Sequence, residues 1–452
     1  MDETPLHHDA EPEASRNETA DGAAIVVLHA GGLGDLVLIE TLIAGLREKH
    51  ADAHVTLICR EHLAPVASLY AHPPDALVTF AFDPYRWATP ADAADVLAPF
   101  LAALALGPVD VFIAAELKST WLGEVLAAAL RPREAIVCDS PSSAPAEVSI
   151  LLRMLRLQRN DVALRPAAKE NEHELDRYAR LLGVARKMPS FRADDAGAAR
   201  EPRIVVFSAG SPDLKRWSNA STREAVSRIA ARTGARVTLV GSSAERADLE
   251  ALASGIDASA PWEIVCGSAA ELPRIATLIA AATGYLAIDT GLAHLAAAYG
   301  IPGVTVYGGG TWPSYAPWGR ASAGVVAPLP CFGCLWDCAF ERAFCLERIS
   351  VDAVVDAFER VALAGRAEPH IAELAPYSAG ERAILGAAAA VHRATQADRA
   401  ARLTVIVRMQ DVWRRYVHHV TQRQAEATAV VVDVTHRLAT ASKRLAERAI
   451  HR

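Results

Sequence analysis

The chain has 452 residues, of which 52% are hydrophobic and 22% are charged, a composition typical of a soluble globular protein. Its length exceeds one ordinary hydrophobic core and predicts two α/β domains with additional segments. The net charge of −7 argues against a general nucleic-acid-binding protein, because such proteins need a basic surface. We therefore expect no nucleic acid among its partners.

The two ends of the chain differ in character. Residues 1–22 are acidic, polar and aperiodic, which predicts disorder. They lack the apolar core of a signal peptide, and no run of about 18 apolar residues predicts a membrane span, so we expect a cytoplasmic protein. Residues 376–452 carry 13 Lys/Arg and six Asp/Glu and have a helical pattern. This basic helical extension is either a hairpin docked on the domains or a helix for self-association or for contact with the inner face of the membrane.

In the first half of the chain, strand and helix patterns alternate. The apolar, β-branched run at 23–30 predicts a buried strand, and a helical pattern follows at 36–48. A second strand at 54–59 completes a βαβ unit. Later elements are strands at 109–116 and 135–138 and a helix near 171–183. We expect residues 23–195 to form one Rossmann-like domain.

The second half repeats this alternation after a linker at 193–202. Strands are predicted at 203–210, 235–241, 263–266, 285–289 and 303–308, the last of which closes the series. Helices are predicted between them at 221–233, 244–253, 271–282 and 291–299. Such alternation is typical of a doubly wound parallel sheet, so the fold class is α/β, with a second Rossmann-like domain at 203–365.

A glycine-rich turn, GGLGD at 31–35, joins the first strand to the first helix. Ligands gather at the carboxyl ends of parallel strands, so this turn borders the expected site. It does not match the dinucleotide fingerprint G-x-G-x-x-G, and no P-loop sequence occurs, so a nicotinamide cofactor and a P-loop are both disfavoured. Asp35 is either a carboxylate facing a cleft or an N-terminal helix cap.

Two turns in the second half are candidates for binding phosphate. Lys215 and Arg216 lie in the turn 208–218, near a predicted helix start, although such a triplet before Trp217 can also be a solvated surface. The stretch DTGLAH at 289–294 ends a strand and opens a helix, whose free N–H groups and dipole suit a diphosphate. A histidine on such a helix is either structural or part of this site.

The ordered set GGLGD, K-R-W and D-T-G-x-x-H-L resembles glycosyltransferase family 9, the heptosyltransferase family, over roughly residues 24–362. The resemblance implies the GT-B architecture, in which two Rossmann-like domains face each other across the active site. It also implies inverting transfer of a heptose, or a related sugar, from a nucleotide donor, expected to be ADP-heptose, to a glycan acceptor such as lipopolysaccharide core. The first domain would bind the acceptor and the second the nucleotide sugar.

The resemblance also implies roles for individual residues. Asp35 would be the base that deprotonates the acceptor hydroxyl, in a turn whose Gly32 and Gly34 lie beside the acceptor. The donor would be bound by residues of the second domain: Lys215, Thr290 and Gly291 at the diphosphate, Glu245 at the ribose, and Asp289 and His294 ordering the turn. No D-x-D sequence occurs, so we expect a metal-independent reaction that requires no cofactor.

The loop 308–319, GGGTWPSYAPWG, departs from the family pattern G-P-T-D-P followed by Arg. Trp312 replaces the acidic residue, and Tyr315 falls near the arginine position. Aromatic side chains in this loop, among them Trp318, could stack on a base or a sugar, or pack within the loop. The donor accepted by this chain is therefore open at this point.

Four of the seven cysteines lie close together in the pattern C-x2-C-x3-C-x6-C, at Cys331, Cys334, Cys338 and Cys345. They are either a structural zinc or iron site or free buried thiols. A cysteine-rich segment here also resembles that of iron-binding, protein-directed heptosyltransferases. That function is one alternative, a sugar-nucleotide epimerase on the same scaffold is a second, and a non-catalytic binding scaffold is a third.

Overall fold

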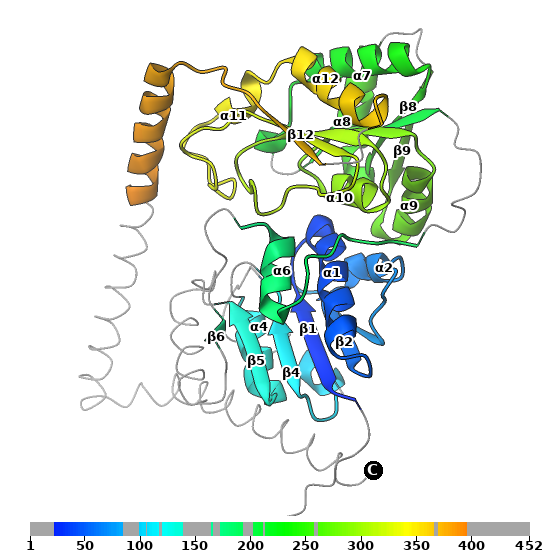
Figure 1. Ribbon diagram of the computed structural model, residues 1–452, viewed down its shortest axis with the longest axis vertical. Coiled ribbons are helices and arrows are strands. Elements are labelled where there is room, and N and C mark those ends of the chain that lie inside the picture. The colour runs from blue at the N-terminus through cyan, green and yellow to red at the C-terminus, as the bar shows by residue number, and fades with distance from the viewer. Residues whose placement is uncertain are drawn as a thin grey trace, which may run out of the picture.

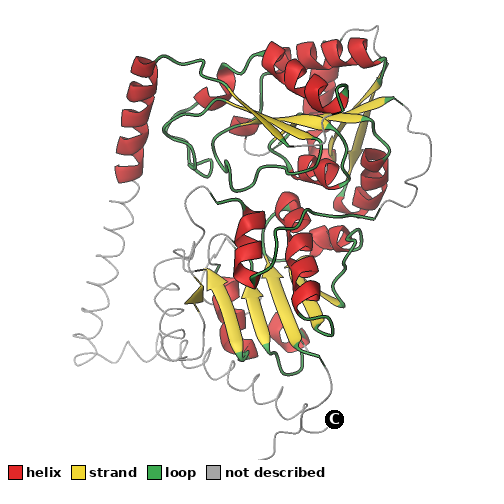
Figure 2. Ribbon diagram, viewed as in Figure 1, coloured by secondary structure: helices red, strands yellow, loops and turns green. Residues whose placement is uncertain are grey.

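The structure is a computed structural model, and it describes residues 22–84, 99–104, 106–116, 120–138, 164–165, 172–192, 202–210, 213–256, 261–365 and 369–395. These residues form two parallel β-sheets, one above the other, each covered by helices (Figures 1 and 2). The predicted α/β class with two Rossmann-like domains is confirmed. The disorder predicted for 1–22 falls, apart from residue 22, outside the described residues.

The first sheet has the strand order β3-β2-β1-β4-β5-β6, and its neighbouring strands run parallel. Its strands are β1 (Ala24–His29), β2 (His54–Arg60), β3 (Ala76–Phe80), β4 (Val111–Ala114), β5 (Glu134–Cys138) and β6 (Leu164–Arg165). Around it lie η1 (Glu61–Leu63) and the helices α1 (Leu33–Lys49), α2 (Ala64–Ala67), α4 (Trp121–Leu130) and α6 (Glu174–Leu182). The central strand β1 is apolar along most of its length because both of its faces are covered.

The second sheet has the order β13-β12-β11-β10-β7-β8-β9. Its strands are β7 (Arg203–Phe207), β8 (Arg236–Ser242), β9 (Trp262–Gly267), β10 (Gly284–Ile288), β11 (Gly303–Tyr307), β12 (Ser322–Val326) and β13 (His370–Glu373). The connecting helices are α7 (Asn219–Thr233), α8 (Arg246–Ala253), α9 (Leu272–Ala280), α10 (Gly291–Ala298), α11 (Phe344–Glu347) and α12 (Val351–Ala362), with short turns η2 (Asp213–Lys215), η3 (Ser243–Glu245) and η4 (Ala269–Glu271).

The prediction that the strand at 303–308 closes the series is wrong, because β12 and β13 extend the sheet beyond β11. β12 has the sequence SAGVV, whose small first residues give little strand signal, and yet all five residues are buried between two neighbouring strands. β13 lies beyond residue 365, the predicted end of the second domain. Both strands form because they pair with strands that are distant in the sequence, and a local sequence pattern does not show such pairing.

Helix α1 connects the two halves of the molecule. Every residue from Leu36 to Leu46 is buried, including Glu40 and Thr41. A helix that is buried all round must be covered on several sides, and α1 packs against α6 and against α10 of the second sheet (Figure 1). One hydrophobic cluster accordingly runs through both halves, from Ile25 in β1 to Tyr285 in β10.

Residues 379–395 form a helix that stands beside the second sheet (orange in Figure 1). His392 Nε2 lies 3.2 Å from Asp337 Oδ1, which links this helix to the cysteine-rich loop. The rest of the predicted basic helical extension, from 396 to 452, lies outside the described residues. None of the helices in the described ranges has the length and apolar character that crossing a bilayer requires.

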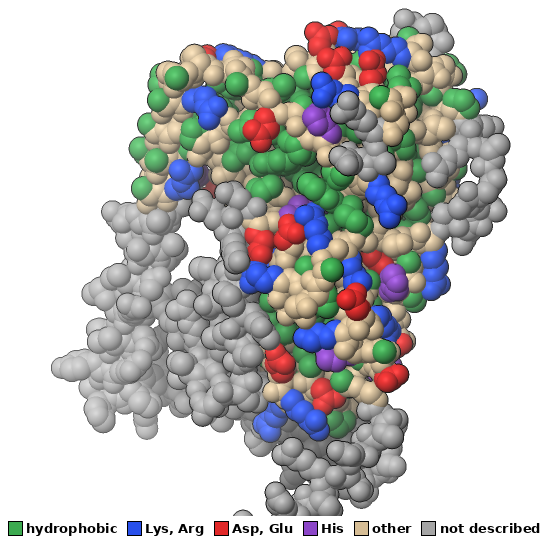
Figure 3. All heavy atoms as spheres, viewed as in Figure 1, with side chains coloured by type: hydrophobic (Ala, Val, Ile, Leu, Met, Phe, Trp, Pro, Cys, Tyr) green, Lys and Arg blue, Asp and Glu red, His purple; other side chains and the backbone are tan. Residues whose placement is uncertain are grey.

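The face shown in Figure 3 carries Lys and Arg side chains interspersed with Asp and Glu side chains. Among the described residues on this face, no stripe of one sign stands out. Nucleic-acid binding needs a basic stripe, so this face offers no support for it.

Candidate active site between the two sheets

The turn after β1 places Asp35 at the start of α1. Gly32 is the N-terminal cap residue of α1, and its backbone N–H donates to Asp35 Oδ2 over 2.6 Å. The expected helix-capping role is therefore real, and it occupies one carboxylate oxygen. The same bond fixes the carboxyl group at the carboxyl end of β1, where ligands of parallel sheets bind.

His29, the last residue of β1, lies beside Asp35. A Cβ added to Gly31 would be 2.5 Å from His29 Nε2 and 2.5 Å from Asp35 Oδ2, so only glycine fits between them. The His29 side chain is buried, and neither ring nitrogen has a hydrogen-bond partner among the described residues. Burial, with Arg177 and Arg60 nearby, lowers the pKa of His29 to about 3, so the ring is neutral at pH 7. The sequence analysis missed this residue, although a polar residue ending a buried strand beside a glycine turn is a usable signal.

The starts of α1 and α10 touch across the two sheets. A Cβ on Gly34 would come within 2.8 Å of His294 Cδ2 and 3.4 Å of Gly291 Cα. A Cβ on Gly291 would come within 2.6 Å of Leu33 Cβ. The structure therefore brings the turn that contains Asp35 together with the predicted phosphate-binding turn. Position 34 needs glycine because a side chain there would collide with His294 of the other half of the molecule.

Lys215 and Asp289 are the charged residues that the second half of the molecule places at the candidate site. Lys215 Nζ lies 3.4 Å from Asp289 Oδ2, and both side chains are largely buried. Thr311 Oγ1 also donates to Asp289 Oδ2, over 3.0 Å. Thr290 is the N-terminal cap residue of α10, and its side chain makes no capping hydrogen bond. A lysine, a free hydroxyl and a helix N-terminus thus share one place, which suits an anion.

Burial raises the pKa of Asp35 to about 6, although the carboxyl keeps some contact with solvent. Its hydrogen bond from Gly32 opposes this rise, while the negative charges of Glu174 and Asp289 add to it and the positive charge of Lys215 opposes it. The Asp35 carboxyl therefore responds to charges from both halves of the molecule. A carboxylate with a pKa near 6 is suited to general base catalysis at neutral pH.

Glu174 and Arg177 form a buried ion pair that the sequence analysis did not single out. Arg177 Nη2 donates to Glu174 Oε2 over 2.6 Å and to the carbonyl of Ala115 over 2.6 Å. The backbone N–H of Glu174 donates to the carbonyl of Ser314, over 3.0 Å, in the loop 308–319 of the second half. The pair therefore joins α6 to Ala115, the residue after β4, and to that loop. Its i, i+3 spacing was visible, but helices carry many such exposed pairs.

His294 is buried in α10, and its Nδ1 has no hydrogen-bond partner in the described part of the chain. Burial lowers its pKa to about 4, so the ring is neutral and packs against Gly34.

The remaining predicted donor residue, Glu245, lies in η3 at the carboxyl end of β8. Its Oε2 accepts hydrogen bonds from the backbone N–H and the hydroxyl of Ser242, over 2.7 and 2.8 Å. Both of these hydrogen bonds lie within the turn that follows β8.

Arg216 does not extend the anion site. It forms ion pairs with Asp248 in α8, at 2.9 Å, and with Asp213, at 3.2 Å. Trp217 next to it is buried in the core below β7. Of the K-R-W triplet, the structure therefore brings Lys215 alone to Asp289.

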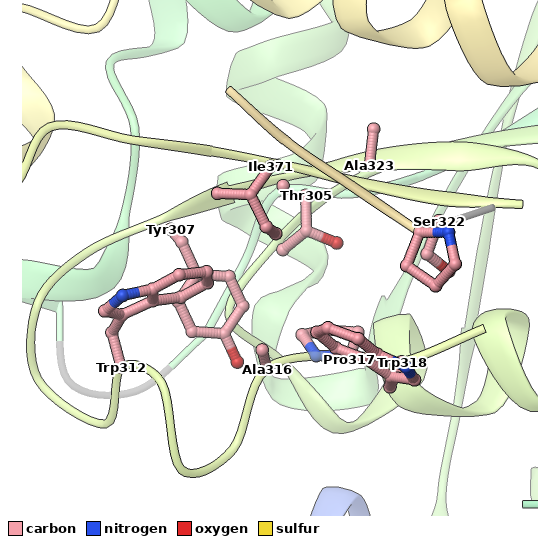
Figure 4. A pocket seen from close by; sticks show the side chains of 11 residues that line it. Thr305, Tyr307, Trp312, Ala316, Pro317, Trp318, Ser322, Ala323 and Ile371 are labelled. Carbon is pink, nitrogen blue, oxygen red and sulfur yellow. The ribbon is translucent and has the colours of Figure 1, made fainter. Parts of the chain in front are cut away.

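The aromatic residues of the loop 308–319 pack on protein. Trp312 lies edge-on to Tyr307, at 5.3 Å between ring centroids. The side chain of Trp318 packs on His173 and beneath the guanidinium of Arg186. Between Trp312 and Trp318 lies a cavity of about 10 Å³, room for one water (Figure 4). This cavity is too small for a nucleotide base, and the described contacts of both tryptophans are with protein side chains.

The four clustered cysteines carry free thiols. They are near enough to one another to raise the pKa of Cys345, which burial brings to about 12. Two of them accept backbone hydrogen bonds instead of converging on a common point: Cys345 from Gly309, over 3.5 Å, and Cys334 from Trp336. In the described ranges no three Cys, His, Asp or Glu side chains are arranged to hold a metal ion. The thiols as placed do not fit a four-sulfur metal centre, and no chemical step is assigned to one.

Comparison with known proteins finds similarity to one family of glycosyltransferases. Residues 154–341 match the sequence profile of glycosyltransferase family 9 (heptosyltransferase). The chain is 28% identical over 224 residues to lipopolysaccharide heptosyltransferase 1 of Pseudomonas aeruginosa, covering 43% of this chain and 60% of that protein. It is 30% identical over 161 residues to the Salmonella typhimurium protein of the same name, covering 33% and 48% respectively. The matches thus span about half of each relative's length.

The fold is similar to that of solved structures over nearly their whole length. The structure of E. coli ADP-heptose lps heptosyltransferase II matches with a TM-score of 0.59 at 15% identity, covering 76% of this chain and 99% of that one. The glycosyl transferase family 9 structure from Veillonella parvula matches with a TM-score of 0.57 at 16% identity, covering 76% and 97%. At this identity the likeness establishes the fold, which is the GT-B arrangement.

Proposed function

We propose that this chain is a member of glycosyltransferase family 9 and that it transfers a heptose or a related sugar from a nucleotide donor to a glycan acceptor such as lipopolysaccharide core. The observation that carries the proposal is the contact between the turn that contains Asp35, in the first half, and the turn at Gly291, in the second, beside which Lys215 pairs with Asp289. A base on one side and an anion-binding cation on the other are what sugar transfer from a nucleotide requires.

The reaction follows from this arrangement as a single displacement. Asp35 accepts the proton of the acceptor hydroxyl, whose oxygen forms a bond to the anomeric carbon of the donor sugar. The bond from that carbon to the diphosphate oxygen breaks at the opposite face, so the configuration inverts. The departing diphosphate takes the electron pair and remains beside Lys215, the Thr290 hydroxyl and the N-terminus of α10.

The chain's own groups provide the positive charge that the leaving group needs. The Lys215 ammonium is only 19% exposed, so its interaction with a diphosphate is weakened less by solvent than that of a surface lysine. The helix dipole of α10 adds a partial positive charge at Gly291. We therefore propose a metal-independent reaction.

The names of the relatives support ADP-heptose as the donor and lipopolysaccharide as the acceptor. Glu245 is our proposal for the ribose contact, because it follows β8, the second strand of its sheet. An acidic residue at this place contacts the ribose in many nucleotide-binding folds of this type. Ser242 holds the Glu245 carboxylate in position through its Oε2.

The first experiment is a thermal-shift screen against ADP, UDP, GDP and ADP-heptose. We expect the ADP compounds to raise Tm and Lys215→Ala to remove the effect. Lys187→Ala is the matched control, since Lys187 is also partly buried in an ion pair, with Glu48, in the first half of the chain. If no nucleotide changes Tm, the proposed function is wrong and a binding scaffold is the better account.

The second experiment tests the base. We expect Asp35→Asn to abolish sugar transfer while it keeps the wild-type affinity for ADP. Asp352→Asn, at an exposed ion pair with Arg228, is the control. Wild-type turnover by Asp35→Asn would remove Asp35 as the base. Conversion of the donor to an epimer without any acceptor would identify an epimerase instead.

A further inference from the structure

The three glycines that follow β11 are covered by two aromatic rings from the cysteine-rich loop. A Cβ on Gly308 would lie 2.5 Å from Trp336 Cη2, and one on Gly310 would lie 2.3 Å from Trp336 Cε2. A Cβ on Gly309 would lie 2.1 Å from Phe332 Cδ1. Glycine at these three positions therefore allows Phe332 and Trp336 to approach the backbone closely.

The backbone of the loop is fastened to the same glycines. The N–H of Gly333 donates to the carbonyl of Gly309, and that of Leu335 donates to the carbonyl of Gly310, each over 2.7 Å. These bonds hold Trp336 next to the carboxyl end of β11. The neighbouring strand is β10, and Asp289 follows it directly. The indole therefore lies on the same side of the sheet edge as the proposed donor site.

Placing this ring costs the protein free energy in two ways. Leu335 and Trp336 both have left-handed backbone conformations, with φ of 50° and 65°, which strain a residue that has a side chain. The indole Nε1–H is buried and has no hydrogen-bond partner among the described residues. A buried donor left unpaired also destabilises the fold. Such costs persist where the position of a group matters for function.

The Trp336 ring contacts Lys215, the residue proposed to bind the diphosphate. Lys215 Nζ lies 5.2 Å from the centroid of the Trp336 ring, within the range of a cation–π interaction. The same ammonium lies 3.4 Å from Asp289 Oδ2. The lysine is thus held from two directions, by a carboxylate and by an aromatic face.

We propose that Trp336 is a positioning residue of the donor site, whose indole face holds the Lys215 ammonium where the diphosphate of the nucleotide sugar binds. The inference rests on the proposed function and extends it, because it makes the cysteine-rich loop a wall of the donor site. The aromatic face attracts the cation without neutralising it, whereas a second carboxylate would compete with the diphosphate for the same charge.

The test is ADP affinity in matched variants, measured by calorimetry. Trp336→Leu removes the aromatic face, and we expect it to weaken ADP binding about 2- to 30-fold, the range that a cation–π contact supplies. Trp336→Phe keeps an aromatic face, and we expect it to retain most of the affinity. Phe332→Leu is the control, because Phe332 packs on the same glycine run and Lys215 lies over the other ring. We expect its ADP affinity to stay within about twofold of wild type.

A double-mutant cycle separates positioning from a general loss of structure. In a Lys215→Met background, we expect Trp336→Leu to cause no further loss of ADP affinity, because the ring acts through the lysine. An equal loss in both backgrounds, or an equal loss from Phe332→Leu, would overturn the proposal.

A nucleotide-free measurement distinguishes failure of this proposal from failure of the proposed function. We expect an amine-acylating reagent, followed by mass spectrometry, to label Lys215 severalfold faster in Trp336→Leu than in wild type, because the ammonium loses one of its two contacts. Unchanged labelling overturns the indole–lysine contact whether or not the protein binds ADP. Faster labelling in a protein that binds no nucleotide would keep the contact and refute the donor site.

Discussion

Gly34 and Gly291 touch across the two sheets: a Cβ on Gly34 would lie 3.4 Å from Gly291 Cα, and a Cβ on Gly291 would lie 2.8 Å from Gly34 N. Each glycine opens a helix of a different half of the molecule, and each is confined by the other. The distance between the proposed base and the proposed leaving-group site is therefore set by two residues that lack side chains.

Alanine at either glycine should push the two halves apart. We expect Gly34→Ala and Gly291→Ala each to lower kcat about 100-fold, since a misplacement of about 1 Å between reacting groups has that effect. ADP affinity should change much less for Gly34→Ala than for Gly291→Ala, because only Gly291 belongs to the donor turn. Gly107→Ala is the control, as an added Cβ there meets nothing within 4 Å. Full activity of Gly34→Ala would contradict the tight contact.

The pKa of Asp35 predicts the pH dependence of turnover. A base must be ionised to accept a proton, and burial raises the pKa of this carboxyl to about 6. We therefore expect kcat to be constant above about pH 7 and to fall about tenfold per pH unit below pH 6. Steady-state kinetics from pH 4.5 to 9 measures this. A kcat that holds its full value down to pH 4.5 would show that Asp35 is not the base, or that its pKa is not raised.

Three buried histidines predict the pH dependence of stability. Burial lowers the pKa of His29 to about 3 and those of His173 and His294 to about 4, whereas each titrates near 6.5 in the unfolded chain. Between about pH 4 and 6.5 the unfolded chain therefore binds protons that the native chain does not. The free energy of unfolding should fall as the pH falls through this window, by up to about 1.4 kcal/mol per pH unit for each histidine.

Asp35 opposes this trend, because its native pKa of about 6 exceeds the ordinary aspartate value of 3.8, so the native chain binds that proton at a higher pH than the unfolded chain does. Urea denaturation at a series of pH values gives the net slope. We expect His173→Gln to reduce the slope by about one proton, since His173 is buried at the start of α6. A slope that this substitution leaves unchanged would show that His173 ionises freely in the native protein.

The Glu174–Arg177 pair predicts an asymmetric mutational response. Arg177→Met leaves the fully buried Glu174 carboxylate without its cation, and we expect a loss of about 3–5 kcal/mol in the free energy of unfolding. Glu174→Leu combined with Arg177→Met removes both charges, and we expect a smaller loss. Equal losses from the single and the double variant would show that the pair contributes as packing rather than as charge. Chemical denaturation measures both.

The local sequence pattern predicts the positions of β1 and α1 well. A continuous apolar run, a glycine turn and a helical pattern lie within about 27 adjacent residues, and the structure has β1 and α1 within two or three residues of the predicted ranges. The same holds for the turn at 289–291, where β10 ends and α10 begins. Hydrophobic periodicity and glycine placement act between neighbours in the chain, so they are visible without a structure.

The strand β12 and the residues around Asp35 show what local pattern does not contain. β12 is a strand because β11 and β13 pair with it, and Glu174 belongs to the site because its backbone bonds Ser314, 140 positions away in the chain. Lys215 meets Trp336 over a similar separation.

The sequence by itself therefore determined the βαβ order of both halves, the glycine turns and the candidate base. The tertiary structure alone decided which charges surround that base, which tryptophan faces the lysine, and that the cysteines lie beside a glycine run. The physical reason is that burial and electrostatic influence depend on distances in space, and packing sets those distances between segments that are far apart in the chain.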